Sequence, residues 1–385
     1  MNNSNFRVDE NILKKILNPE DREDLLDYIF KKLISLSSLG FIELEFLEIS
    51  QGRIPVIAVN KPNDLSQIER VFIFTGAQHN EYNGLFGQIA FLTEFIEKKS
   101  INLLPENLVI LLFPLMNPYG FLNPRRDNKS GYYLKSGANL NRCWRRTFIP
   151  NFEENNENID LNPIPENSIA FKNYIQEYWD REIELYIVDF HETSLFRRFS
   201  EDMAKNLNAF YKFEHPYQMW TVQYLTKYED LPKREPLFVK PSHCIDHHHF
   251  NLNINQGEKL REDFKKAWEI NKAKLPFYYV FTQKSKDFCK TIAKKVQENL
   301  KDILWDVRKP AHKHVANHGC IVCLGYSTSR PKTFTCELEV DKQFFNLFEE
   351  AEKCNSDKAY FDKKMKNISS TVKIVKETIK QAVFF

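Results

Sequence analysis

Apolar residues near the start of the chain recur at helical spacing. Pro19 interrupts this pattern, whose apolar positions are Ile12, Ile16, Leu25, Leu26, Ile29 and Leu33. Apolar side chains three or four residues apart lie on one face of a helix, and proline ends or kinks a helix. Residues 1–45 therefore predict an N-terminal helical extension, formed by a pair of helices that pack on the main domain.

Short apolar runs then alternate with helical patterns along the rest of the chain. The runs that predict strands are residues 71–75, 108–113, 185–190 and 333–340. The patterns that predict helices are residues 85–98, 169–179, 287–303 and 357–382. Such alternation with buried strands is typical of an α/β domain. We therefore predict an α/β fold with a mixed, mostly parallel sheet flanked by helices.

The same pattern predicts the division of the chain. The main domain is expected over residues 46–345, with a long insertion at about residues 195–325. Residues 346–385 predict a C-terminal helix that packs on this domain. No internal repeat is visible.

Composition and charge exclude several classes of protein. The 385 residues are 42% apolar and 28% charged, and 54 Lys and Arg against 52 Asp and Glu give a net charge of +2. No basic stripe with interleaved aromatic residues stands out, so we expect no nucleic-acid partner. The apolar runs are strand-sized, so we also expect no membrane partner. The oligomeric state cannot be read from the sequence.

The cysteines and histidines give weak signals. Seven cysteines are scattered through a chain with no recognisable secretory signal, which favours a reduced, cytoplasmic protein. Cys320 and Cys323 have the C-x-x-C spacing but lie in an apolar run without a second pair, which disfavours a zinc or redox role. The run His243 to His249 resembles a metal site in composition only, because adjacent histidines cannot all face one ion.

Polar side chains follow three predicted strands. The segment GAQHNE ends at Glu81, PLMNPYGF covers residues 114–121, and His191 directly follows residue 190. In open α/β sheets, ligands bind beyond the carboxyl ends of the strands. A catalytic zinc typically takes three protein ligands and leaves the fourth position to water. Glu81 and His191 are therefore candidate ligands, although each alone is a weak signal, since both residue types are common at strand and helix ends for structural reasons.

Five segments in order resemble the carboxypeptidase A-like zinc metallopeptidase family, which includes amino-acid deacylases of the aspartoacylase type. They are GAQHNEYNG, NPYGFLNPRRDN, NLNRCW, VDFHETS and FTCELEV, between residues 71 and 340. The N-terminal helices and residues 195–325 have no match. The resemblance implies one zinc ion, with Glu81 and His191 among its ligands, and Glu337 as the carboxylate that takes a proton from the attacking water and passes it to the leaving amine.

The resemblance also implies how a substrate would be held. Arg126 would stabilise the oxyanion, and Asn141 and Arg142 would hold the terminal carboxylate of the substrate. Tyr326 could reach the substrate as the mobile tyrosine of the family does, although its spacing from Glu337 is shorter than in the digestive enzymes. An arginine suits this role because its guanidinium grips a carboxylate with two parallel hydrogen bonds.

The departure from the family lies at the first zinc ligand. The family motif is H-x-x-E, and here Gln78 stands in place of the histidine and His79 in place of a glycine. Gln78 and Glu81 can face one ion from a single helical turn, although an amide oxygen is a weaker donor than imidazole. His79 is the alternative ligand if the turn is remodelled. The aspartate that orients the family's histidine is Asn139 here, so we infer that Gln78 and Asn139 changed together.

These observations predict a zinc-dependent hydrolase that cleaves an amide bond next to a free carboxylate. Its substrate would be a peptide or an N-acyl amino acid with a free carboxylate. The alternatives are a deacylase of the aspartoacylase type and a catalytically silent peptide-binding protein on the same fold. The presence of Glu337 favours activity, because a binding module has no need of a general base.

Overall fold

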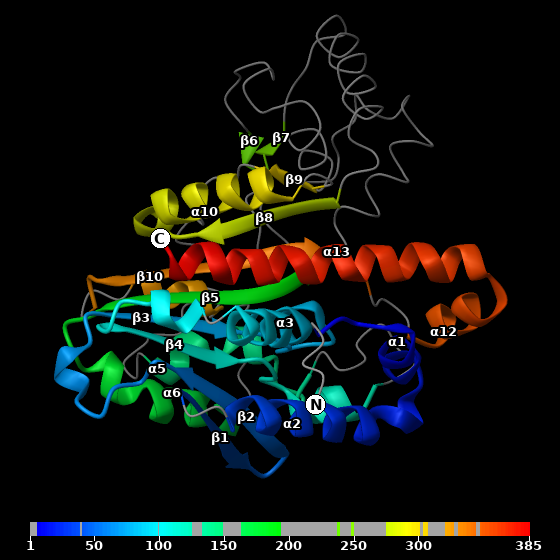
Figure 1. The fold of residues 1–385 in the computed structure, drawn as a ribbon, viewed down its shortest axis with the longest axis horizontal. Coiled ribbons are helices and arrows are strands. Elements are labelled where there is room, and N and C mark those ends of the chain that lie inside the picture. The colour runs from blue at the N-terminus through cyan, green and yellow to red at the C-terminus, as the bar shows by residue number, and fades with distance from the viewer. Residues whose placement is uncertain are drawn as a thin grey trace, which may run out of the picture.

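The computed structural model describes residues 6–38, 41–98, 100–124, 133–148, 163–193, 237–238, 248–249, 275–300, 303–306, 320–326, 330–343 and 347–385. Its main feature is an eight-stranded sheet with the order β1-β2-β4-β3-β5-β10-β8-β9 (Figure 1). These strands are β1 Ile42–Ile49, β2 Gly52–Val59, β3 Arg70–Thr75, β4 Leu108–Phe113, β5 Glu184–Thr193, β8 Leu275–Phe281, β9 Ile303–Asp306 and β10 Thr333–Asp341. Strands β6 Leu237–Phe238 and β7 His248–His249 form a separate pair.

The centre of the sheet is parallel and its edges are mixed. Strands β4, β3, β5 and β10 run parallel to one another. Strand β2 is antiparallel to β4, and β8 is antiparallel to β10. Every residue of β4 is apolar and buried, as expected of a strand that is covered on both faces of the sheet. The predicted α/β fold with a mixed sheet flanked by helices is thus confirmed.

Helices cover both faces of the sheet. Phe72 and Phe74 belong to a core shared with most of the helices, whereas Val71 and Ile73 belong to a second core on the other face. The first core includes residues of α1 Glu10–Leu17, α2 Arg22–Ser37, α3 Asn83–Glu97, α10 Lys286–Asn299, α12 Leu347–Ser356 and α13 Lys358–Val383. The second includes residues of α5 Trp144–Phe148 and α6 Glu166–Trp179.

Both terminal regions contribute to the first core. The predicted helical pair is present as α1 and α2, separated at Pro19, and Asp9 caps α1 by accepting a hydrogen bond from the Ile12 N–H at 2.8 Å. The region predicted as one C-terminal helix contains two, because Asp357 starts α13 by capping the N–H of Tyr360 at 3.0 Å. Helix α13, red in Figure 1, lies along α3 and α10.

Most of the predicted insertion at about residues 195–325 lies outside the described residues, as does the run His243 to His249 except for its last two residues. Of its described strands, β8 and β9 extend the main sheet beyond β10, and β6 and β7 form the separate pair. The cysteines in the described ranges are free and buried. Among the described helices, none combines the length and the apolar character that a membrane crossing requires.

Candidate metal and catalytic site

Strand register places three polar residues in one row across the sheet. Asp189 on β5 is the register partner of Thr75 on β3 and of Glu337 on β10. His191 lies two residues after Asp189, so its side chain points to the same face of the sheet. All three strands are parallel, and the row crosses the carboxyl end of β3 at Thr75 and the middle of β5 and β10. His191 lies nearer the carboxyl end of β5, where the strand-end pattern predicted ligand-binding side chains.

The loop after β3 is fixed by its backbone. Ala77 adopts a left-handed conformation with φ of 48°, which turns the chain sharply after the strand. The N–H groups of Met116 and Asn117 donate to the carbonyls of Gly76 and Ala77, both at 3.0 Å. Asn117 also donates through Nδ2 to the Gln78 carbonyl at 3.1 Å. Residues 76–81 are therefore held at the edge of the sheet, with every side chain from Ala77 to Glu81 buried.

The His191 ring separates two carboxylates. Its Nδ1 lies 2.9 Å from Glu81 Oε2, and its Nε2 lies 2.7 Å from Asp189 Oδ2. Burial disfavours the charged imidazole, but Asp189 and Glu81 together raise the pKa of His191 well above its usual range. Burial likewise opposes ionisation of Glu81, but His191 and Lys342 lower its pKa to about 2. Without a bound ion, the site therefore favours an imidazolium between two carboxylates.

A lysine and a second glutamate complete this side of the site. Lys342 Nζ lies 3.7 Å from Glu81 Oε1 and donates to Asn80 Oδ1 at 2.9 Å. Glu192 accepts hydrogen bonds from the backbone N–H of Asn83 at 2.7 Å and of Gln343 at 3.2 Å. Burial raises the pKa of Glu192 to about 7 despite Lys342 and these two donors. Glu192 thereby ties the end of β5 to the start of α3.

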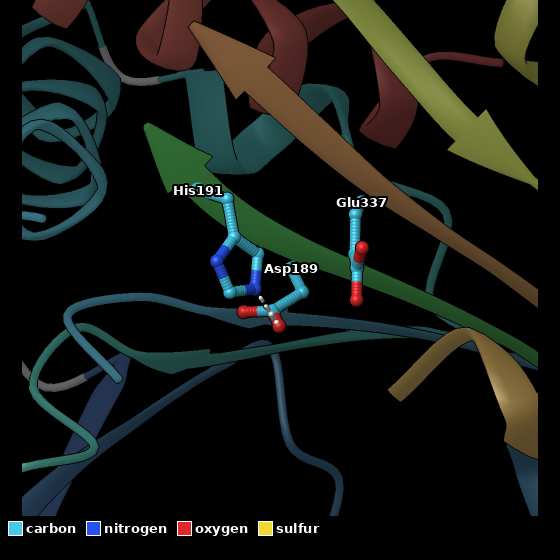
Figure 2. Close-up of side chains that lie close together, drawn as sticks. All are labelled: Asp189, His191 and Glu337. Atoms are coloured by element: carbon cyan, nitrogen blue, oxygen red, sulfur yellow. Dashed lines mark hydrogen bonds and ion pairs between the residues drawn. The ribbon is translucent and has the colours of Figure 1, made fainter. Parts of the chain in front are cut away.

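Glu337 lies on the other side of His191. Ligand atoms of Asp189, His191 and Glu337 all lie within 4.8 Å of one another. Figure 2 shows these three side chains side by side on the neighbouring strands β5 and β10. Oε1 of Glu337 is buried and has no hydrogen-bond partner among the described residues. Burial raises the pKa of Glu337, and the positive charges of His191 and Arg142 oppose this rise. A carboxyl group can take up and release a proton when its pKa is raised and one of its oxygens makes no hydrogen bond.

Gln78 lies in the same cluster, and both the nitrogen and the oxygen of its side-chain amide make hydrogen bonds. Its Nε2 donates to Asp189 Oδ2, and its Oε1 accepts a hydrogen bond from Trp144 Nε1 at 3.1 Å. His79 is buried, and its ring centroid lies 5.7 Å from that of His191. The expectation that Gln78 or His79 is the third ligand stays a prediction.

The predicted substrate-binding residues divide into two groups. Asn141 and Arg142 lie in a short turn capped by Asn139, whose Oδ1 accepts from the Asn141 N–H at 2.9 Å. The positive charge of Arg142 opposes the rise in the pKa of Glu337, so this turn contributes to the electrostatics of the predicted base. Arg126 lies outside the described residues, and of Tyr326 only the backbone is described, at the end of the short helix Ile321–Tyr326.

The charges of the site fit a divalent cation. Four buried carboxyl groups gather here, and the permanent cations that act on them among the described residues are Lys342 and Arg142. The four groups are those of Glu81, Asp189, Glu192 and Glu337. Carboxylate oxygens and imidazole nitrogen are donors that zinc accepts. A dication in place of the proton on His191 would meet the ionised carboxylate of Glu81, whose pKa is lowered to about 2.

Sequence reasoning missed three contacts of this site. Asp189 was not among the predicted site residues, although its spacing from His191 already put both side chains on one strand face. Lys342 follows the strand that carries Glu337, and this strand-end position was the signal that could have identified it. No signal in the sequence pairs Trp144 with Gln78, because 66 residues separate them.

Comparisons with known proteins concern the fold. Neither a protein-family model nor a curated protein matches the chain. A solved metallo-carboxypeptidase from Burkholderia cenocepacia is 13% identical, with a TM-score of 0.48 over 94% of this chain and 69% of that one. A metallo-carboxypeptidase from Pseudomonas aeruginosa in complex with (2-guanidinoethylmercapto)succinic acid is 11% identical, with a TM-score of 0.46 over 93% and 69%.

Bovine thrombin-activatable fibrinolysis inhibitor, solved in complex with tick carboxypeptidase inhibitor, is 11% identical with a TM-score of 0.48 over 94% of this chain and 97% of that one. At such identities and TM-scores, these similarities carry no argument about the activity of this chain. That activity has to be argued from the side chains of the site.

Proposed function

We propose that the protein is a metal-dependent hydrolase that cleaves an amide bond next to a free carboxylate, with zinc as its metal. The observation that carries the proposal is the convergence of donor atoms of Asp189, His191 and Glu337 within 4.8 Å, on the adjacent parallel strands β5 and β10. Glu81 adds a carboxylate on the Nδ1 side of the same imidazole. The gathering of four buried carboxyl groups supports a divalent cation as their partner.

Glu81 and His191 would hold the ion. When bound, such an ion lowers the pKa of a water molecule and polarises the carbonyl of the substrate. Glu337 takes the proton from the attacking water and passes it to the leaving nitrogen. Its free Oε1 and raised pKa suit both halves of this transfer.

Asn141 and Arg142 would bind the carboxylate end of the substrate. Arg142 lies in a turn whose geometry is set by Asn139 and acts electrostatically on Glu337. Asn141 is buried, and its Oδ1 has no partner among the described residues, so it is available to a ligand. Arg126 and Tyr326 keep their predicted roles in oxyanion stabilisation and substrate contact.

The test begins with the metal content of the purified full chain and its hydrolysis of two substrate sets. C-terminally varied peptides test the carboxypeptidase reaction, and N-acyl amino acids test the deacylase reaction. We expect stoichiometric zinc and turnover of at least one set. A chain that holds zinc and binds these compounds without hydrolysing them would instead be the silent binding protein.

Glu337→Gln tests the role of the base. We expect this variant to retain zinc and to lose turnover by about a hundredfold or more, as removal of a general base does. Glu352→Gln, at an exposed position on α12, is the matched control and should behave like the unaltered chain. Unchanged turnover in Glu337→Gln would remove Glu337 as the base.

A further inference from the structure

We propose that a groove between the first and the last helices of the chain is a docking site for a peptide segment of a partner protein, in which an arginine stands beside apolar residues. The groove has a volume of about 820 Å³ and lies where the end of α1 meets α12 and the start of α13. Figure 1 shows α1 and α12 next to each other at one end of the molecule. None of the described residues that line the groove belongs to the candidate metal site, so the proposal is independent of the proposed function.

The floor of the groove is apolar. Leu17 at the end of α1 is buried, and the rings of Phe348 on α12 and Phe361 on α13 are half-buried. Lys364 and Glu350 are both buried and form an ion pair at 2.5 Å, which holds α13 against α12. The helices that carry the two rings are therefore fixed relative to each other before anything binds, and a preformed site loses less entropy on binding.

The rim of the groove is negatively charged. Glu20, which is exposed, and Asp21, which is half-buried, both line it. The Asp21 carboxylate accepts a hydrogen bond from Asn18 Nδ2 at 2.9 Å, and within the described residues no cation pairs with it or with Glu20. Lys14 also lines the groove, but its Nζ lies 2.7 Å from Glu10 Oε1. The rim therefore carries two carboxylates whose charge the described part of the chain leaves uncompensated.

Two helix ends add negative potential to the groove. Leu17 is the last residue of α1, Asn18 is its C-cap, and Cys354 and Asn355 lie in the last turn of α12. The last carbonyl groups of a helix make its C-terminus equivalent to about half a negative elementary charge. Because residues of both helix ends line the groove, their partial charges act in the same sense as the carboxylates of the rim. The groove therefore favours a cation over a neutral or anionic ligand.

The combination of rings and carboxylates selects an arginine among the cations of proteins. A guanidinium stacks on aromatic rings and pairs with carboxylates in its own plane, whereas an ammonium is compact and strongly hydrated. Phe348 and Phe361 offer the rings, and Glu20 and Asp21 offer the carboxylates. A volume of about 820 Å³ lies within the range of about 300–1,000 Å³ that bound ligands fill, so apolar neighbours of the arginine have room over the floor. An apolar centre within a polar rim is also the usual anatomy of a protein interface.

Calorimetric titration of the unaltered full chain with the tripeptide Leu-Arg-Leu tests the proposal. Both ends of the peptide are blocked, so it has no free carboxylate and is not a substrate of the proposed hydrolase. A matched peptide carries citrulline in place of arginine, which keeps the shape and removes the charge. We expect the arginine peptide to bind at least about fivefold more tightly, the effect of two exposed ion pairs. Equal affinities, or no binding of the arginine peptide at about 1 mM, would overturn the proposal.

A variant without the two rim charges locates the site. Glu20→Gln and Asp21→Asn, combined in one chain, keep the size of both side chains and should abolish the preference for the arginine peptide. Glu23→Gln, at an exposed position on α2 outside the groove, is the matched control and should keep the preference. A preference that survives in the combined variant would place the peptide elsewhere and refute the groove.

Methyl signals of the unaltered chain keep the test decisive if the combined variant fails to fold. Ala351 lines the groove, and in protein labelled with ¹³C at the alanine methyl groups its signal should move when the arginine peptide is added. Comparison with Ala351→Ser identifies this signal. An Ala351 signal that stays in place while the peptide is bound would contradict the proposal.

Two other occupants are outcomes of the same experiments. Arginine amide that binds as tightly as the tripeptide would make the ligand a small cation. Dimers that are seen by light scattering and dissociate when the tripeptide is added would make the occupant a second copy of the chain. Either result contradicts a partner segment. None of these measurements depends on zinc or on turnover, so the proposed function stands or fails separately.

Discussion

Removal of the charge on Lys342 should destabilise the metal-free protein more than the metal-bound protein. Lys342 Nζ lies 3.7 Å from Glu81 Oε1, and its side chain is 13% exposed. Two unit charges at this separation interact by about 4 kcal/mol at an effective dielectric constant of about 20. Loss of one partner of a buried pair costs about 3–5 kcal/mol when the other charge is left uncompensated, and here His191, 2.9 Å from Glu81 Oε2, keeps the cost at the low end of this range. We expect Lys342→Met to lower the free energy of unfolding by about 3 kcal/mol without metal.

A bound dication would take over this compensation. The cost of Lys342→Met in saturating zinc should then be smaller by at least about 1.4 kcal/mol, and by linkage the variant should bind zinc about tenfold more tightly. Urea unfolding with and without zinc measures the first quantity, and chelator competition measures the second. Lys376→Met is the matched control, since Lys376 pairs with Glu94 away from the site and should show no dependence on zinc. Equal costs of Lys342→Met in both conditions would refute the reasoning.

Two further predictions concern the helix pair α3 and α13. A Cβ atom on Gly87 would overlap Val375, so Gly87→Ala should lower the free energy of unfolding by about 1–3 kcal/mol in urea, and a gain in stability would contradict this packing. Partial burial opposes ionisation of Glu94, but hydrogen bonds from Lys376 and Lys98 lower its pKa from 4.5 to about 2. Because the pKa of Glu94 is lower in the folded protein than the ordinary 4.5, the ionised carboxylate stabilises the fold above pH 4.5. This contribution is lost as the pH falls through about 2. As the pH is lowered, the free energy of unfolding of Glu94→Gln should therefore fall less steeply than that of the unaltered protein. Parallel curves of the two proteins against pH would exclude the effect.

Much of the fold follows from local patterns. The run at residues 108–113 is a strand with those bounds, because a short continuous apolar run marks a buried central strand well. The run at 333–340 is a strand that extends by one residue. The hairpin formed by β1 and β2 was not predicted from the sequence. Strand β1 has the sequence IELEFLEI, in which charged and apolar residues largely alternate. This period of two could have predicted the edge strand from the sequence.

The site was harder to predict because its contacts are set by register. Glu81 and His191 could be identified from their positions after predicted strands, and the structure brings them within 2.9 Å. The alignment of strands and helices that are far apart in sequence brings Asp189 and Trp144 to the side-chain amide of Gln78. Local propensity does not determine such alignment. The third ligand could not be resolved from spacing for the same reason.

The separation of these residues along the chain also bears on how the protein matures. Thr75 and Asp189 meet across 114 residues, and the third member of the row comes from β10 near the other end of the chain. Contacts of such long range close slowly and late in folding. The proposed ligands Glu81 and His191 are themselves 110 residues apart, so a nascent or partly collapsed polypeptide should be unable to hold the proposed ion before β3 and β5 have paired.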